Sequence, residues 1–451
     1  MSYDIKIKNG LTINLKGAAQ NIIIKAAAPK TVSINPSNFH LIIPKMVVKI
    51  GQKISQGDVV FFSKKDERIK FCSPVNGVVK EIIRGAKRKI IEIIIESIGD
   101  NERSSKKAID YKNLSSEQVK NLLLDSGCWP FIKQRPYDII ANPSDSPKSI
   151  FISTFNSAPI SADFQIILDD QKEEFKHGVK ILSKLFSGDL NIGIEKNNKS
   201  FLNDIENVKI NTFNGPHPAG NVGVQIHHID PINSGEKVWT LGAEDVANIG
   251  RYFMTGSYNP VRTLAVSGPP VKYPKYYKTV AGSELCEIIK DAGINQNDNL
   301  RFINGDVLTG YKVESDNYLG FYNNTLSVLR EGNHYRMFGW VPFVNNKVPS
   351  IYKTSFSWLF PNKKYDLDTN LNGEERALVV TGEMEKVFPM DILPMQLLKE
   401  CMAGNIEKME SLGIYEVAPE DFSLIDYSSS SKIEAQYIIR KGLDLMISEV
   451  V

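Results

Sequence analysis

Cysteine is scarce in this sequence, and its spacing excludes two kinds of metal site. The four cysteines, Cys72, Cys128, Cys286 and Cys401, lie far apart and form no C-x-x-C pair. Structural zinc and cysteine-ligated iron–sulfur clusters need thiolates at short spacing, so the sequence predicts neither. Four free thiols are typical of a reducing compartment, which indicates a cytoplasmic protein.

Long hydrophobic runs are also missing. The longest, Ile90 to Ile95, is broken by Glu92, whereas a membrane span needs about 18 consecutive apolar residues. The first six residues alternate polar and apolar side chains and lack the apolar core of a signal peptide. With 451 residues, 42% of them hydrophobic and 24% charged, the sequence predicts a soluble globular protein of about three domains.

Neither sign of charge dominates the chain as a whole, whose net charge is +2, but residues 1–100 carry +9 and residues 101–451 carry −7. A basic N-terminal part is suited to an acidic partner or an anionic membrane surface, or is simply a solvated lysine-rich face. Nucleic acid is a poor candidate partner, because the overall balance is near neutral and no basic helix or ribonucleoprotein motif occurs.

Glycine turns between short β-branched runs mark residues 32–97. Val47 to Val60 holds two glycines six residues apart, and Phe71 to Ile82 frames a further turn. This pattern is similar to a biotinyl/lipoyl-type barrel-sandwich hybrid, whose carrier form presents a lysine between methionines at a hairpin tip. Here the tip, Ser63 to Glu67, has no methionine, so we expect a structural or docking barrel.

A polar linker is predicted over residues 98–113. The helix after it begins at a capping box formed by Ser115 and Gln118 and ends near Gly127.

A parallel βαβ pattern follows, with strands at 150–154, 190–194 and 208–213. The helix between the first two strands buries one face, which carries Phe175, Val179, Leu182 and Phe186. A later helix carries Val246, Ile249 and Phe253 and stops at Gly256. The adjacent His227 and His228 are expected on opposite faces of a strand.

A shaped loop is predicted after the third strand. Its glycines and prolines would let a phosphate or a partner backbone approach closely, but the spacing is neither G-x-G-x-x-G nor a P-loop. We expect it to support assembly, with His217 a hydrogen-bonded loop residue and not a general base, because no carboxylate or thiol lies near it in the sequence. The residues of this loop are Gly215, Pro216, His217, Pro218 and Gly220.

Residues 261–315 predict a β–α–β–β unit with a helix over 283–292, which looks like the soluble-ligand-binding β-grasp (SLBB) fold. Beyond Phe388 the chain is predicted to be helical. Ser428 to Ser431 are expected to cap a helix over 433–446, and an earlier helix is expected to carry on one face Leu397, Leu398, Cys401 and Met402. The predicted domains are 1–100, 101–260, 261–330 and 331–451.

The order of these parts, together with several motifs, resembles the A subunit family of the Na⁺-translocating NADH:quinone reductase over essentially the whole chain. The resemblance implies a multidomain α/β protein: a biotinyl/lipoyl-like barrel-sandwich hybrid with an N-terminal strand, a Rossmann-like α/β domain related to the complex I flavin subunit, an SLBB β-grasp domain and a C-terminal helical region. The matching motifs are Arg84 to Arg88, Gly215 to Gly220, Val238-Trp239, Ile249-Gly250, Thr255-Gly256, Phe338-Gly339-Trp340 and Phe388 to Pro394.

Two departures from the wider family bear on cofactors. Related subunits of complex I and Rnf-type complexes hold flavin mononucleotide with a G-x-G-G-x-x-F-P loop and a cluster with C-x-x-C-x-x-C. The corresponding loop here, Asp125 to Phe131, keeps one glycine and places the bulky Trp129 where amides would approach phosphate. The C-terminal helices have no cysteine triplet. The resemblance therefore implies that this chain binds no cofactor and that flavins and an iron–sulfur cluster belong to other subunits.

The resemblance implies a peripheral subunit on the cytoplasmic side of the bacterial inner membrane. It would contact the other subunits of the complex, membrane-embedded ones included. It would contribute to the ubisemiquinone-to-ubiquinol step that the complex couples to sodium export. The chain is thus expected to be part of an enzyme, with no redox activity in isolation. Sodium ligation in a pump requires intramembrane polar groups, so we expect the ion path in other subunits.

Two alternatives stay open. The first is a cofactor-free structural or assembly subunit of the same or an Rnf-like complex. The second is an autonomous flavin- or NADH-dependent oxidoreductase, which needs a phosphate-binding loop that this sequence lacks.

The best candidate for direct contact with ubiquinone is residues 129–137. Trp129, Phe131 and Tyr137 offer flat apolar surfaces, and Lys133 or Arg135 would stabilise negative charge on a quinone oxygen. The competing interpretation is that the same aromatic side chains pack the α/β core or a subunit interface.

Overall fold

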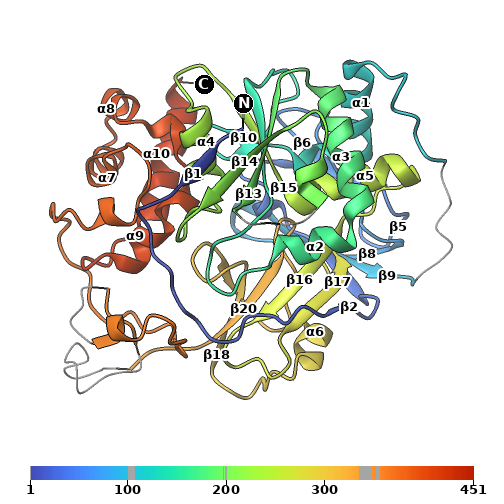
Figure 1. Ribbon diagram of the computed structural model, residues 1–451. Helices are drawn as coiled ribbons and strands as arrows, with labels where there is room; N and C mark the ends of the chain where they lie inside the picture. Colours follow the sequence, from blue (N-terminus) through green and yellow to red (C-terminus); the bar gives the residue numbers. More distant parts are fainter. Residues whose placement is uncertain are drawn as a thin grey trace.

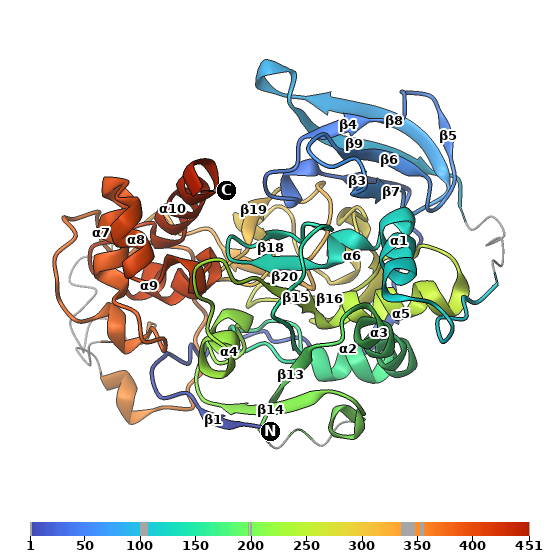
Figure 2. The same cartoon turned by 90° about the horizontal axis from the view of Figure 1, so that it is seen from above.

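The computed structural model describes residues 2–99, 107–196, 198, 201–334, 348–351 and 356–450. Within these residues the strands form sheets of seven, six, four and three strands, and the C-terminal helices gather at one end of the molecule (Figures 1 and 2). The Phe338-Gly339-Trp340 motif and part of the predicted linker lie outside the described residues.

The barrel is built from two small antiparallel sheets, which Figure 2 shows standing to one side of the other domains. One sheet has the order β3 (Thr31–Ile34), β9 (Ile90–Ser97), β8 (Gly77–Arg84) and β5 (Lys53–Ile54), and the other β4 (Pro44–Met46), β6 (Val59–Ser63) and β7 (Lys70–Cys72). Val60, Phe61 and Ile93 are fully buried, and a register shift between Val59 and Phe61 interrupts the alternation of inner and outer residues in β6.

The central seven-stranded sheet confirms the predicted parallel α/β arrangement. Its parallel strands are β1 (Asp4–Lys6), β14 (Lys209–Asn214), β13 (Asp189–Glu195), β12 (Ser149–Ser153) and β15 (Val238–Gly242). An antiparallel hairpin, β10 (Lys133–Arg135) and β11 (Ile139–Ile140), completes the edge beside β15.

Helices cover both faces of this sheet. Ile150 and Ile152 of β12 join the core formed by α1 (Ser116–Ser126), α3 (Lys172–Leu185) and α5 (Ala243–Thr255). Phe151 points the other way, onto α4 (Val222–Ile229). The Ser115–Gln118 capping box of α1, its left-handed Gly127 end and the left-handed Gly256 end of α5 are all as predicted.

Two glycines allow α3 and α5 to pack closely. A Cβ at Gly178 would lie 2.0 Å from the carbonyl oxygen of Val246, and one at Gly250 would lie 1.8 Å from that of Glu174. These contacts give a physical reason for the Ile249-Gly250 motif.

The β-grasp sheet has the order β19 (Tyr311–Val313), β18 (Leu300–Asn304), β20 (Thr325–Arg330), β16 (Val261–Ser267), β17 (Lys275–Val280) and β2 (Ile23–Lys25). The short helices α6 (Cys286–Asp291) and α2 (Phe164–Asp170) pack beside it. The N-terminal residues also contribute to two other sheets, because β1 pairs with β14 of the central sheet and β2 with β17. The chain therefore crosses two other domains before it enters the barrel.

The C-terminal helices share a core of their own. They are α7 (Pro394–Ala403), α8 (Ile406–Ser411), α9 (Ser423–Ser428) and α10 (Ala435–Val450). Leu397, Leu398 and Cys401 are buried as predicted, but Met402 is 64% exposed, because it lies past the edge of the buried stripe.

Two other local predictions were wrong. The backbone N–H of Ala435, at the start of α10, donates to Asp426 and not to the serine run. His227 and His228 lie in helix α4. The carboxylate of Glu416 lies 2.7 Å from Nδ1 of His227, and the carbonyl of Val224 lies 3.0 Å from Nδ1 of His228.

Candidate functional site

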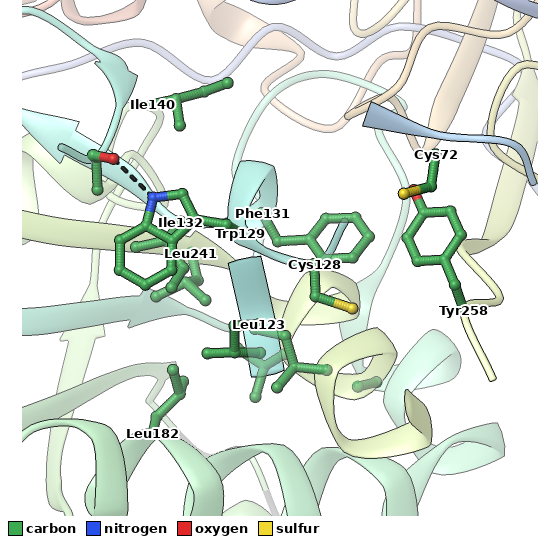
Figure 3. Packing of buried hydrophobic residues seen from close by; sticks show 14 of the residues in the cluster. Cys72, Leu123, Cys128, Trp129, Phe131, Ile132, Ile140, Leu182, Leu241 and Tyr258 are labelled. Atoms are coloured by element: carbon green, nitrogen blue, oxygen red, sulfur yellow. Dashed lines mark hydrogen bonds between the residues drawn. The ribbon is translucent and has the colours of Figure 1, made fainter. Parts of the chain in front are cut away.

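The predicted quinone segment, residues 129–137, lies mostly inside the protein. Trp129 is fully buried, its indole Nε1 donates to the carbonyl of Ala141 at 2.7 Å, and its ring meets Trp239 edge-on at 5.5 Å. Figure 3 shows it packed among Ile132, Ile140 and Leu241. Trp129 thus has the packing role that was the competing interpretation.

Three other residues of the segment are also enclosed. Phe131 stacks on Phe321 with centroids 5.2 Å apart, and Tyr137 is 7% exposed. Arg135 is 1% exposed and forms ion pairs with Glu420 and Asp421 of the 3-10 helix η8 (Pro419–Phe422). Arg135 and Tyr137, which meets Tyr415 edge-on at 6.4 Å, hold the β10–β11 hairpin against the C-terminal region. Direct contact between these side chains and quinone stays a prediction.

Lys133 is the exception, because it lines a polar cavity of about 100 Å³ together with aromatic and aliphatic side chains. Its Nζ lies 3.4 Å from Asp138 and 4.6 Å from the ring centre of Tyr322. We call this space the polar cavity; its lining residues are Ser37, Asn38, Phe39, His40, Lys133, Asp138, Ile139, Ile140 and Tyr322.

Asp138 keeps its negative charge in this place. Burial on its own raises the pKa of Asp138, but the cations Lys133, Arg135 and Arg440 outweigh burial and lower that pKa to about 2. Asp138 also has a left-handed backbone, with φ of 50°, and follows Tyr137 with φ of 83°. Two successive strained residues at a cavity wall are typical of sites where a turn must place side chains accurately.

His40 also lines the polar cavity, and nothing in its local sequence pointed to it. Its Nε2 lies 2.7 Å from a carboxylate oxygen of Asp444 in α10. Arg440, one turn earlier in α10, donates from Nε to the same oxygen at 2.9 Å and from Nη1 to the carbonyl of Tyr137 at 2.7 Å. The polar cavity itself is bounded by the barrel, the α/β domain and Tyr322 of the β-grasp domain, and α10 holds His40 and Tyr137 from behind.

A narrow apolar crevice adjoins the polar cavity, and Asn38 and Phe39 line both. Phe39 lies at the centre of an aromatic group, 4.4 Å from the ring of Phe71 and 4.9 Å from that of Phe321. The crevice also reaches Gly127 and Pro130, which flank Trp129 in sequence. The two spaces together offer a polar compartment next to an apolar one.

The N-terminus of α5 is where a parallel α/β sheet ordinarily binds a nucleotide phosphate. Here the first turn of α5 carries two acidic residues, Glu244 and Asp245. The carboxylate of Glu244 is fully buried and accepts hydrogen bonds from the backbone N–H of Thr263 at 3.0 Å and from its hydroxyl at 2.8 Å, and Arg262 pairs with Asp245. Two carboxylates in the first turn disfavour a second anion, so the residues at this helix end do not fit a flavin or dinucleotide phosphate.

The glycine–proline loop after β14 is largely internal. The side chain of His217 is 3% exposed, with Nδ1 3.0 Å from the hydroxyl of Ser157, which also accepts from the N–H of Gly220 at 2.8 Å. Burial lowers the pKa of His217 to about 4. Pro218 is buried as well, which leaves Gly215 and Pro216 as the accessible part of the loop; their contact with a partner stays a prediction.

Two further observations concern metals and membranes. No group of three or more His, Cys, Asp or Glu side chains in the described part of the chain is arranged to hold a metal ion. Likewise, none of the helices within the described ranges has the length and apolar character to cross a bilayer.

Comparisons with known families support the domain order. Family models match residues 5–97 as the NqrA N-terminal barrel-sandwich hybrid domain, 114–258 as the NqrA second alpha/beta domain and 263–315 as the NQRA C-terminal (SLBB) domain. These matches confirm the predicted barrel, α/β and SLBB folds.

Similar proteins of full length are known. The A subunit of the Na(+)-translocating NADH-quinone reductase of Photorhabdus laumondii is 34% identical over 97% of this chain and 98% of its own length. The protein of that name from Marinomonas sp. is 34% identical over 98% of this chain and 99% of its own length. The one from Neisseria meningitidis is 33% identical over 99% of this chain and 100% of its own length. An NAD⁺-reducing [NiFe]-hydrogenase aligns with 75% of this chain and 62% of its own, at 11% identity and a TM-score of 0.38.

Proposed function

Because the chain belongs to the A subunit family of the Na⁺-translocating NADH-quinone reductase, we propose that it holds the quinone of that complex during reduction, with the ring in the polar cavity. The observation that carries this proposal is the pair of adjoining compartments that share Phe39. A quinone has a polar ring and an apolar isoprenoid tail, and the polar cavity and the apolar crevice match these two parts.

Lys133 supplies the electrostatic part of the proposal. A negative charge about 4 Å from an ammonium group gains about 4 kcal/mol at an effective dielectric constant of 20. Asp138, at 3.4 Å, cancels part of this attraction, so a net gain of about 1–2 kcal/mol is a reasonable expectation. Stabilising a reduced quinone in this way fits the ubisemiquinone-to-ubiquinol step.

Docking of this chain on the cytoplasmic face of the membrane is the second part of the proposal. Four cations, Arg84, Lys87, Arg88 and Lys89, are exposed at the turn between β8 and β9. Within the described residues, no carboxylate forms an ion pair with any of them. We call this turn the basic hairpin. It is suited to anionic lipid or acidic partner segments, while sodium export, the flavins and the iron–sulfur cluster belong to the other subunits.

A purely structural or assembly role is the second candidate function. It is favoured by the burial of Trp129, Phe131, Arg135 and Tyr137, four of the five predicted quinone contacts. In this case the polar cavity would hold water only.

Quinone titration of the purified chain, followed by tryptophan fluorescence, tests the proposal. Ile139→Trp fills the polar cavity and should raise the Kd for ubiquinone at least about tenfold, the change that 1.4 kcal/mol produces. The matched control is Ile91→Trp on the barrel surface, where the isoleucine is 44% exposed. Each variant is compared with its own ligand-free fluorescence. Unchanged affinity in folded Ile139→Trp would reject the polar cavity, and no binding to the wild-type chain would favour the structural role.

A further inference from the structure

His40 and Asp444 form a hydrogen-bonded pair at the edge of the polar cavity. His40 is one of the residues that line the cavity, and its Nε2 lies 2.7 Å from Asp444. Both side chains also reach the surface, with exposed fractions of 35% and 39%. The pair thus touches the cavity on one side and bulk water on the other.

The carboxylate of this pair is held in place from its own helix. Arg440 donates to Asp444 at 2.9 Å and to the backbone carbonyl of Tyr137 at 2.7 Å. The remaining charged groups that line the cavity are Lys133 and Asp138, which pair with each other. Neither is therefore required to neutralise His40 or Asp444.

The chemistry of quinone reduction needs a group that delivers protons. Forming a quinol takes two electrons and two protons, and the electrons come from the other subunits of the complex. Imidazole is the side-chain type that gives up and regains a proton near neutral pH, whereas an ammonium group holds its proton. An imidazole bonded to a carboxylate through one nitrogen presents its other nitrogen to a partner in a defined tautomer.

We propose that His40 is the proton donor to the quinone oxygen, with Asp444 as its positioning residue; this rests on the proposed quinone site. As the oxygen gains electron density, an N–H bond of the His40 imidazolium breaks and an O–H bond forms on the quinone. The imidazole is left neutral and retains the proton shared with Asp444. Bulk water reprotonates it at the exposed edge before the second proton is delivered.

The test compares His40→Gln with His177→Gln in the assembled complex. His177 is a half-buried histidine on α3 whose Nδ1 lies near the carbonyl of Glu173, so its replacement is the matched control. His40→Gln should lower the rate of quinol formation about 100-fold, the usual contribution of a general acid, and leave the Kd for ubiquinone within about threefold. Asp444→Asn should produce a smaller loss and shift the pH profile of the rate.

A second variant separates chemistry from folding. In His40→Ala, added imidazole should restore quinol formation in proportion to its concentration, which a structural role would not produce. Normal turnover in His40→Gln, or a loss that imidazole does not rescue, overturns the proton-donor assignment. Failure of the quinone site itself has a different signature, because Ile139→Trp would then leave quinone affinity unchanged.

Discussion

Removing the charge of Arg135 should destabilise the interface between the α/β domain and the C-terminal helices and lower the free energy of unfolding. Arg135, in β10, donates from Nη1 to Asp421 at 3.2 Å and from Nη2 to Glu420 at 2.5 Å. The arginine and Asp421 are 1% and 0% exposed, whereas Glu420 is 39% exposed. Arg135→Met keeps most of the side-chain volume and leaves Asp421 without its cation.

The stability lost in Arg135→Met follows from the burial of Arg135 and Asp421. Taking one partner from a buried ion pair leaves an uncompensated charge and costs about 3–5 kcal/mol. Burial already raises the pKa of Asp421, and Arg135 opposes this rise. Without the arginine, the carboxyl group should take up a proton more readily. Arg135→Met with Asp421→Asn should therefore regain much of the lost stability, since the amide still accepts from the N–H of Ala418.

Urea unfolding, followed by tryptophan fluorescence, measures these changes in the free energy of unfolding. The control is Arg330→Met, which removes an ion pair with Asp366 whose side chains are 53% and 45% exposed. Exposed pairs contribute less than about 1 kcal/mol. A stabilising role for the buried pair is refuted if Arg135→Met lowers the free energy of unfolding no more than Arg330→Met does. It is also refuted if the double variant is no more stable than Arg135→Met alone.

Three further predictions follow from other parts of the molecule. Trp129→Ala should lower the free energy of unfolding by about 3–5 kcal/mol, because it removes a fully buried ring and the bond to Ala141; loss of quinone affinity in a variant that stays as stable as wild type would contradict the packing role. Burial lowers the pKa of His217 to about 4, below the ordinary value of about 6.5. The stability that comes from keeping this histidine neutral is therefore fully present above pH 6.5 and is lost as the pH falls from 6.5 to 4. Wild type should lose about 3 kcal/mol more than His217→Asn over that interval in urea titrations, and parallel pH curves would refute the assignment. Replacing Arg84, Lys87, Arg88 and Lys89 with Gln should weaken binding to vesicles containing phosphatidylglycerol, by about 1 kcal/mol per charge, whereas Gln at Lys172, Lys176, Lys180 and Lys184 of α3 should not; equal losses would point to net charge alone.

Local interactions explain what the sequence by itself determined. A capping box is made by residues three apart, and the left-handed ends at Gly127 and Gly256 depend on one residue each. Alternating buried strands and amphipathic helices likewise predicted the parallel core of β12, β13 and β14. The domain order and its motifs were enough to indicate the family, which the full-length relatives confirm.

Only the tertiary structure decided what lies beside what over long sequence distances. His40 and Asp444 are 404 residues apart and Arg135 and Asp421 are 286 apart, so no periodicity relates them. The flat apolar side chain of Trp129 suggested a ligand contact, but docking of the β10–β11 hairpin on β15 encloses it. The β1 and β2 strands join other sheets because a short strand pairs wherever an open edge meets it. The polar cavity is likewise a product of docking, since each of its walls comes from a different domain.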